Sequence, residues 1–191
     1  MKLSLPTSKS QINRIGHLYG ASLALILSQY CLEDNAIKLL VTTDNHAASQ
    51  LAAELKFFAN QQEILLFPDW ETLPYDHFSP HQDIISERLK ILNKLQSNSN
   101  LIIIAAISTL MHRLCPNKFI NQNSFALAVG EQLSIDNFRT NLEKSGYYCV
   151  NTVLERGEFS VRGSIIDVFP MGAKLPFRIE LFDDEIDTLR T

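Results

Sequence analysis

Basic residues, cysteines and long apolar runs are all scarce in this sequence, and each scarcity excludes a class of protein. Its 191 residues include 17 lysines and arginines against 21 aspartates and glutamates, which gives a formal net charge of -4. Duplex binding depends largely on clustered basic side chains that neutralise phosphates, so a broad DNA footprint is not expected. No stretch approaches the roughly 20 apolar residues that span a bilayer, and the N-terminus lacks a signal-peptide core. We expect a cytoplasmic protein without a membrane partner.

Catalytic and metal-binding signatures are also missing. The sequence has three widely spaced cysteines: Cys31, Cys115 and Cys149. This spacing suits reduced thiols better than disulfides or a CxxC metal site. His77 and His81 flank a proline and lack the helical geometry of HExxH, while the carboxylates at 183–185 are interpreted as a solvated turn rather than a divalent metal site. We predict no catalytic residue and no metal.

A phosphate-binding loop is missing where a nucleotide-binding fold would need one. P-loop ATPases cradle phosphates with GxxxxGK[ST] at a helix N-terminus. Aligning Gly20 with the first glycine puts three apolar residues where the second glycine, the lysine and the hydroxyl residue should be: Leu25, Ile26 and Leu27. Phosphate charge and magnesium would both be unmatched. We interpret this segment as a buried apolar helix with a degenerate nucleotide loop, and expect neither bound ATP or magnesium nor enzyme activity from this chain.

What the sequence does contain, up to about residue 120, is an alternation of helices and apolar strands. Apolar residues at helical spacing predict helices over 16–32, 45–59 and 81–96, the first broken by the polar residues 33–35. Short apolar runs predict strands over 37–43, 63–67 and 101–106. Near-continuous apolar strands that alternate with helices are typical of a parallel sheet covered on both faces. We predict an α/β domain over residues 1–120.

Beyond the polar segment 116–124 the pattern changes, and we predict a smaller α+β domain over residues 121–191. Ser134 can cap a helix that runs to about residue 145, and Gly146 is a suitable stop. Segments 147–154, 159–169 and 176–189 predict three strands of a mostly antiparallel sheet. The sequence stops at Thr191 directly after a strand-like run, so we expect it to be part of a longer chain.

Two long motifs carry a family resemblance. The first is DWETLPYD at 69–76 followed by FSPHQDIISERL at 78–89, a proline-stiffened loop that we expect to be ordered and to bury its aromatic residues: Trp70, Tyr75 and Phe78. The second is ERGEFSVRGSIIDVFPMG at 155–172, continued by PFRIELFDDEID at 176–187. With both motifs, nearly the whole chain resembles the N-terminal, UvrB-like module of the bacterial transcription-repair coupling factors, the Mfd family.

The resemblance implies an adaptor. It implies a UvrB-like, parallel-sheet first domain with a degenerate P-loop, and a second domain that docks on the excision-repair protein UvrA and recruits it to stalled RNA polymerase. Contacts with RNA polymerase and DNA, and ATP-dependent translocation, belong in that family to domains absent from this sequence. Arg162, Arg178 and Phe182 match family positions that contact UvrA. The resemblance also suggests that another domain covers this docking face in the intact protein.

Other interpretations stay open at this point. Arg178 and Phe182 are four residues apart, hence on one face of a strand, and arginines and aromatics are enriched in binding hot spots. Alternatively, Phe182 is a core residue and the arginines pair with nearby carboxylates: Glu180, Asp183 or Asp184. The alternative function is a direct DNA-binding module with UvrB-like architecture. An ATP-hydrolysing enzyme would require the phosphate site that the sequence lacks.

Overall fold

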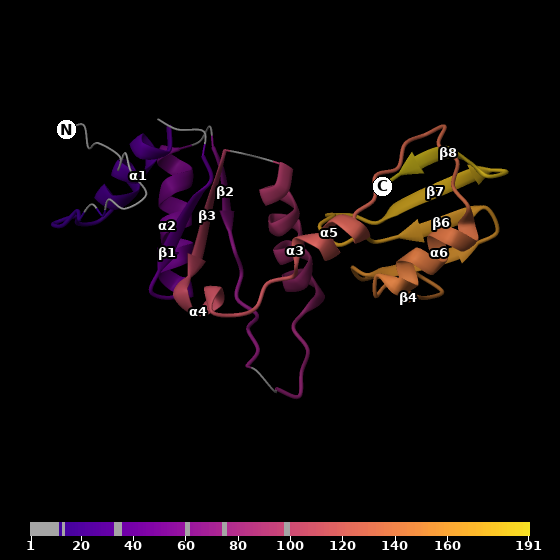
Figure 1. The fold of residues 1–191 in the computed structure, drawn as a ribbon, viewed down its shortest axis with the longest axis horizontal. Coiled ribbons are helices and arrows are strands. Elements are labelled where there is room, and N and C mark those ends of the chain that lie inside the picture. Colours follow the sequence, from indigo (N-terminus) through magenta and orange to yellow (C-terminus); the bar gives the residue numbers. More distant parts are fainter. Residues whose placement is uncertain (1–11, 13, 33–35, 60–61, 74–75, 98–99) are drawn as a thin grey trace. The chain divides into compact units, whose positions relative to one another are not determined.

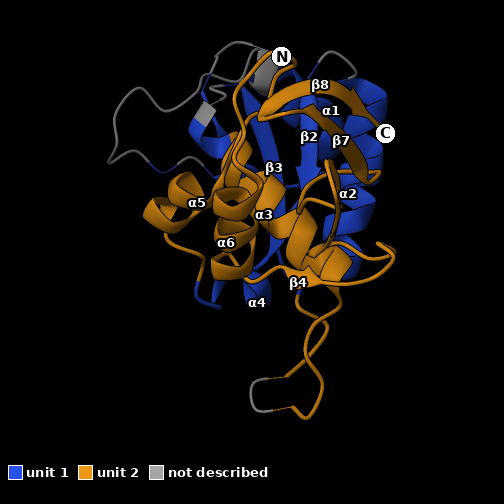
Figure 2. Cartoon of the chain, turned by 90° about the vertical axis from the view of Figure 1, so that its right-hand side faces the viewer, with its two compact units in different colours: residues 1–69, 95–113 blue, residues 70–94, 114–191 orange. Residues whose placement is uncertain are grey.

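The computed structural model describes residues 12, 14–32, 36–59, 62–73, 76–97 and 100–191, which form two compact units (Figures 1 and 2). The first unit comprises residues 1–69 and 95–113, and the second comprises 70–94 and 114–191. These limits differ from the predicted domains 1–120 and 121–191, because the loop and helix at 70–94 group with the second unit. The α/β class is as predicted. The predicted helix break at 33–35 and Tyr75 lie outside the described residues.

The first unit is built on a three-stranded parallel sheet. Its strands, in the order β1-β3-β2, are β1 (Lys38–Thr42), β3 (Leu101–Ala106) and β2 (Glu63–Leu66). Its helices are α1 (Ser22–Leu32), α2 (Asn45–Phe58) and the short α4 (Ile107–Leu110). All three strands and the first two helices follow from the hydrophobic periodicity, whereas α4 was not predicted. No helix in the described ranges has the length and apolar character needed to cross a bilayer.

Helix α2 forms the core of the first unit with one face of this sheet. It begins after Asp44, whose side chain accepts a 2.8 Å hydrogen bond from the backbone N–H of Ala47 and so caps the helix. Its buried side of alanines and leucines packs against Ile102 and Ile104 of β3. The other side of β1 carries Leu39 and Val41, which are about half exposed, so the prediction of a sheet covered on both faces is wrong for this strand.

The second unit is built on a five-stranded sheet. Its strands, in sheet order, are β4 (Tyr148–Cys149), β5 (Glu158–Arg162), β6 (Ile165–Val168), β7 (Phe177–Phe182) and β8 (Glu185–Arg190). The β4–β5 pair is parallel and the other pairs are antiparallel. The prediction of three long strands is wrong, because 159–169 and 176–189 each fold into a hairpin. Gly163 and Asp183 adopt positive φ angles of 60° and 53° at the two turns.

Helix α6 covers one face of the five-stranded sheet (Figure 1). It spans Ile135–Lys144, and its buried Phe138 and Leu142 pack against strand residues that include Ile166 and Ile179. The hydroxyl of Ser134 accepts a hydrogen bond from the backbone N–H of Asn137, so Ser134 is the predicted cap. This arrangement gives the sheet one apolar face under α6 and leaves its other face for polar residues.

Helix α3 (Gln82–Ser97), up to residue 94, and the loop before it belong to the second unit, and specific contacts explain why. The backbone N–H of Gly172 donates a hydrogen bond to the hydroxyl of Ser86, and Arg156 forms an ion pair with Asp83. In the loop, Trp70 stacks under the guanidinium of Arg88, 4.0 Å from ring centroid to Cζ. Phe78 is 78% exposed, so the expectation that the loop buries its aromatic side chains is wrong there.

Candidate functional site

The candidate site is the face of the five-stranded sheet that points away from its apolar core. Alternation along β7 sends Ile179 and Leu181 into the core, and therefore sends Arg178 and Phe182 to the opposite face. Arg162 ends β5, two strands away in the same sheet. The structure thus brings the three predicted contact residues to one face of the same sheet, and the side chains of the two arginines converge on that face.

Arg162 and Arg178 share the carboxylate of Asp167, which lies between them on β6. Arg178 forms a two-pronged contact, in which Nε donates to Oδ1 at 2.7 Å and Nη2 donates to Oδ2 at 2.9 Å. Arg162 donates from Nη2 to Oδ2 at 3.0 Å. The side chain of Asp167 is only 12% exposed, against 60% for Arg162 and 48% for Arg178. The acid is therefore recessed, while both guanidiniums reach solvent.

The strand register explains this arrangement. Asp167 is the direct partner of Arg178 in the β6–β7 pair, and Arg162 pairs with Ile165 two residues before Asp167. Side chains two positions apart on a strand share a face, so Arg162 and Asp167 can meet on a diagonal across β5 and β6. The pKa of Asp167 lies below its usual value, and the hydrogen bonding from Arg178 is the largest cause. Asp167 in turn raises the pKa of Arg178.

Phe182 lies at the end of β7, just before the turn with Asp183. Its side chain is 75% exposed, so the interpretation of Phe182 as a core residue is wrong. The ring is therefore accessible to a partner on the polar face of the sheet. The alternative that both arginines pair with carboxylates of the chain is confirmed in kind, but their partner is Asp167 rather than Glu180, Asp183 or Asp184.

A second ion pair lies on the same face, beside the trio of Arg162, Asp167 and Arg178. Arg190 of β8 is the direct partner of Arg178 in the strand register, and its Nη2 donates to Oε2 of Glu180 at 2.7 Å. The hydroxyl of Thr188 donates to the same oxygen at 3.0 Å. Sequence reasoning missed Asp167, Glu180 as a partner of Arg190, and Arg190 itself. The available signal was Asp167, a charged residue within the apolar run IIDVF.

A shallow groove of about 400 Å³ runs over this cluster. Its lining consists of Thr152, Val153, Arg162, Asp167, Pro176, Phe177, Arg178, Arg190 and Thr191. Three guanidiniums and the recessed carboxylate of Asp167 line the groove, and Glu180 beside it pairs with Arg190, so positive charge still exceeds negative charge there. Such a surface can bind a partner through charge-assisted hydrogen bonds to carboxylates, and it holds no nucleophile and base placed for chemistry.

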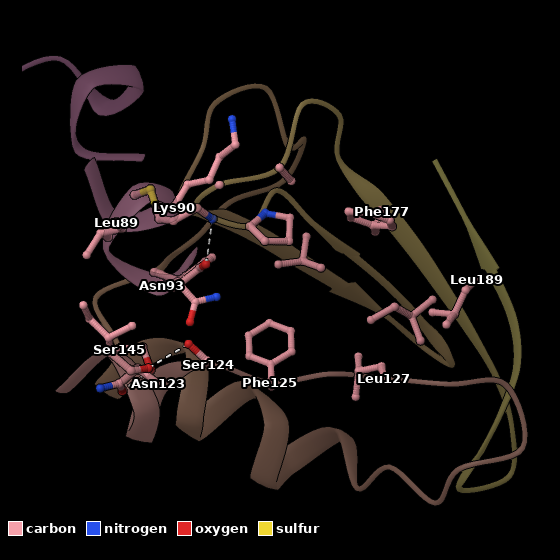
Figure 3. A pocket seen from close by; sticks show the side chains of 18 of the residues that line it. Leu89, Lys90, Asn93, Asn123, Ser124, Phe125, Leu127, Ser145, Phe177 and Leu189 are labelled. Carbon is pink, nitrogen blue, oxygen red and sulfur yellow. Dashed lines mark hydrogen bonds between the residues drawn. The ribbon is translucent and has the colours of Figure 1, made fainter. Parts of the chain in front are cut away.

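A larger, mainly apolar cleft of about 950 Å³ opens on the other side of the sheet (Figure 3). Its walls are α3, helix α5 (Asn117–Asn123), which was not predicted, and the apolar sheet face. In Figure 3, Phe125 and Leu127 point into the cleft from one wall, and Phe177 and Leu189 from another. The sequence motifs gave no sign of this cleft, because its lining comes from segments distant in sequence.

The predicted degenerate nucleotide loop lies in the first unit. Gly20 adopts a φ of 56° in the turn before α1, and no strand precedes it among the described residues 12 and 14–21. Leu27 packs against the core, whereas Leu25 is exposed, so the interpretation of this helix as buried is wrong at Leu25. Ile26 is half-buried. These residues contribute no hydrogen-bonding side chain to the unit.

Known proteins of one family resemble this chain over most of its length. Residues 125–191 match the UvrB interaction domain. The chain is 44% identical to the transcription-repair-coupling factor of Haemophilus influenzae over 187 residues, which cover 98% of this chain and 16% of that protein. It is 40% identical to the Escherichia coli transcription-repair-coupling factor over 189 residues, 99% of this chain and 16% of that protein. The Staphylococcus aureus (strain USA300) protein of the same name is 32% identical over 170 residues, 89% of this chain and 14% of that protein.

The chain therefore spans about a sixth of the length of the two more similar of these curated relatives. The candidate face, with Arg162, Arg178 and Phe182, lies within the part that matches the UvrB interaction domain. Identity of 40–44% over nearly the whole chain, together with this domain match, shows that the chain belongs to the transcription-repair-coupling factor family.

Proposed function

We propose that this chain is the adaptor segment of a transcription-repair coupling protein, and that it recruits UvrA to stalled RNA polymerase in the cytoplasm. The observation that carries this proposal is the exposed face of the five-stranded sheet, where Arg162, Arg178 and Phe182 lie outside the core. Arginine and aromatic side chains dominate binding hot spots, because a planar fork and a rigid ring make specific contacts at low entropic cost. The match to the UvrB interaction domain supports the choice of partner.

The mechanism is binding rather than chemistry. The first unit acts as a scaffold, and its Gly20 turn, with Leu25, Ile26 and Leu27, supplies no phosphate ligand in this proposal. ATP, magnesium, contacts with DNA and contacts with RNA polymerase are assigned to parts of the longer relatives that this chain does not span. The face supplies guanidinium forks and one aromatic ring for a protein surface.

The test is the affinity of this chain for UvrA, measured by calorimetry with the unmodified protein and with Arg162→Ala and Arg178→Ala. Each substitution is expected to weaken binding by tenfold or more, because truncating a central arginine removes directed contacts and leaves its partner unpaired. Arg139→Ala is the matched control, since Arg139 forms an exposed ion pair with Glu143 on α6. Absence of binding by the unmodified chain would overturn the proposal.

Direct DNA binding is the competing function, and the charge of the chain disfavours it. Three arginines line the groove, which is far from the broad basic stripe that duplex binding uses, and the whole chain has a formal net charge of -4. Fluorescence anisotropy with a labelled duplex at low and physiological salt discriminates between the two functions. Duplex binding that falls steeply with salt and is lost in Arg178→Ala would favour the DNA-binding module instead.

A further inference from the structure

Asp167 is the one acidic side chain that touches both predicted contact arginines among the described residues. It reaches them from β6, the strand between β5 and β7, so three adjacent strands contribute one residue each. The carboxylate is nearly buried beneath two guanidiniums that are about half exposed. A recessed acid in this place is poorly situated to meet a partner, but it is well situated to fix the two side chains above it.

The hydrogen bonds leave most guanidinium donors available. Each arginine has five N–H donors, of which Arg178 gives two to Asp167 and Arg162 gives one. The remaining donors include both N–H groups on Nη1 of each arginine. Because both guanidiniums reach solvent, these N–H groups can donate to a partner's carboxylates in the two-pronged geometry that arginine favours.

The net charge of these three residues and the rotamer entropy of the two arginines both decide how a partner can bind. Two guanidiniums and one carboxylate leave the trio with a net positive charge, so the complementary surface is anionic. A free arginine side chain loses considerable rotamer freedom when a partner binds it, and a guanidinium already held in place loses less. On the basis of the proposed UvrA docking, we propose that Asp167 is a positioning residue, which fixes Arg162 and Arg178 so that their outward N–H groups bind carboxylates of the partner.

The first experiment uses the free chain and needs no partner. Asp167→Asn keeps the size of the side chain but removes the charged acceptor for Nε–H of Arg178. Arginine-selective NMR is expected to show a shifted Nε–H signal for Arg178 and faster exchange of that proton with water. An Nε–H signal unchanged from the unmodified chain would overturn the positioning role, whatever UvrA does.

The second experiment is a double-mutant cycle on UvrA affinity, with Asp167→Asn, Arg178→Ala and the double variant compared by calorimetry. Asp167→Asn is expected to weaken binding by about tenfold, and to cause a smaller loss in the Arg178→Ala background, where Asp167 can act only through Arg162. Fully additive losses would overturn the proposal. Thermal unfolding of each variant confirms that the folded state is being compared.

Glu143→Gln is the matched control away from this face. It breaks the exposed ion pair between Glu143 and Arg139 on α6, and it leaves the three arginines of the groove unchanged. We expect this variant to bind UvrA within about threefold of the unmodified chain. A loss equal to that of Asp167→Asn would show that any broken ion pair weakens binding, and would overturn the specific role. If the unmodified chain fails to bind UvrA, the docking function falls, and the NMR result alone decides whether Asp167 positions the arginines.

Discussion

Gly172 donates its backbone N–H to the hydroxyl of Ser86 across 2.7 Å, and this hydrogen bond joins α3 to the loop after β6. Ser86 is buried, so removal of its hydroxyl leaves the N–H of Gly172 without an acceptor in a place that water reaches poorly. We predict that Ser86→Ala lowers the free energy of unfolding by about 1–2 kcal/mol, as measured by urea denaturation. Ser22→Ala serves as the control, because the hydroxyl of Ser22 forms an exposed bond to Tyr19. Equal losses in the two variants would contradict a special role for the α3 contact.

Gly146 ends α6 with a φ of 89°, and its N–H donates to the carbonyl of Glu143. A Cβ at this position would meet nothing within 4 Å, so the cost of Gly146→Ala comes from the left-handed backbone alone. We predict a loss of about 1–2 kcal/mol, seen as a lower unfolding temperature in calorimetry. Gly16→Ala is the control, since a Cβ there also meets nothing and the backbone has no positive φ. A loss as large in Gly16→Ala would rule out the conformational explanation.

Hydrophobic periodicity predicted the first unit well and the second unit less well, for a physical reason. β3 occupies residues 101–106 as predicted, because a buried parallel strand is one continuous apolar run. In the second unit the alternation continues on both sides of tight turns at Gly163 and Asp183, so each hairpin resembles one long strand. Helix α5 escaped prediction because its seven residues are mostly polar and bury only Ile120.

Sequence reasoning named three residues of the candidate face, Arg162, Arg178 and Phe182, but it missed Asp167 and Arg190 and could not supply the contacts that join them. Period-two alternation placed Arg178 and Phe182 on one face, and the structure confirms their exposure. The role of Asp167 depends on which strands are neighbours and in which register, and that information is set by long-range pairing. The assignment of α3 to the second unit likewise depends on contacts between residues far apart in sequence, such as Arg156 and Asp83.

The lowered pKa of Asp167 predicts a pH dependence of stability. Arg178 and Arg162 hold the pKa of this carboxyl below its usual value, against the opposite effect of its burial, so its ionised form favours the folded state. That contribution is fully present above the unfolded pKa and is lost as pH falls through the folded pKa. We predict that the excess unfolding free energy of the unmodified chain over Asp167→Asn is constant near neutral pH and shrinks below about pH 4. Urea denaturation across a pH series measures it, and a difference that stays constant at acidic pH would contradict the ion-pair assignment.

Phe182 separates binding from stability, because its side chain is 75% exposed and outside the core. We predict that Phe182→Ala changes the free energy of unfolding by less than about 0.5 kcal/mol, as is usual at exposed positions, but weakens UvrA binding by about tenfold or more. Phe78→Ala is the matched control, since Phe78 is 78% exposed in the loop before α3. Urea denaturation and calorimetry of both variants give the two readouts. If Phe182→Ala binds UvrA as tightly as Phe78→Ala and the unmodified chain, Phe182 does not belong to the docking surface. Recognition would then rest on the arginines.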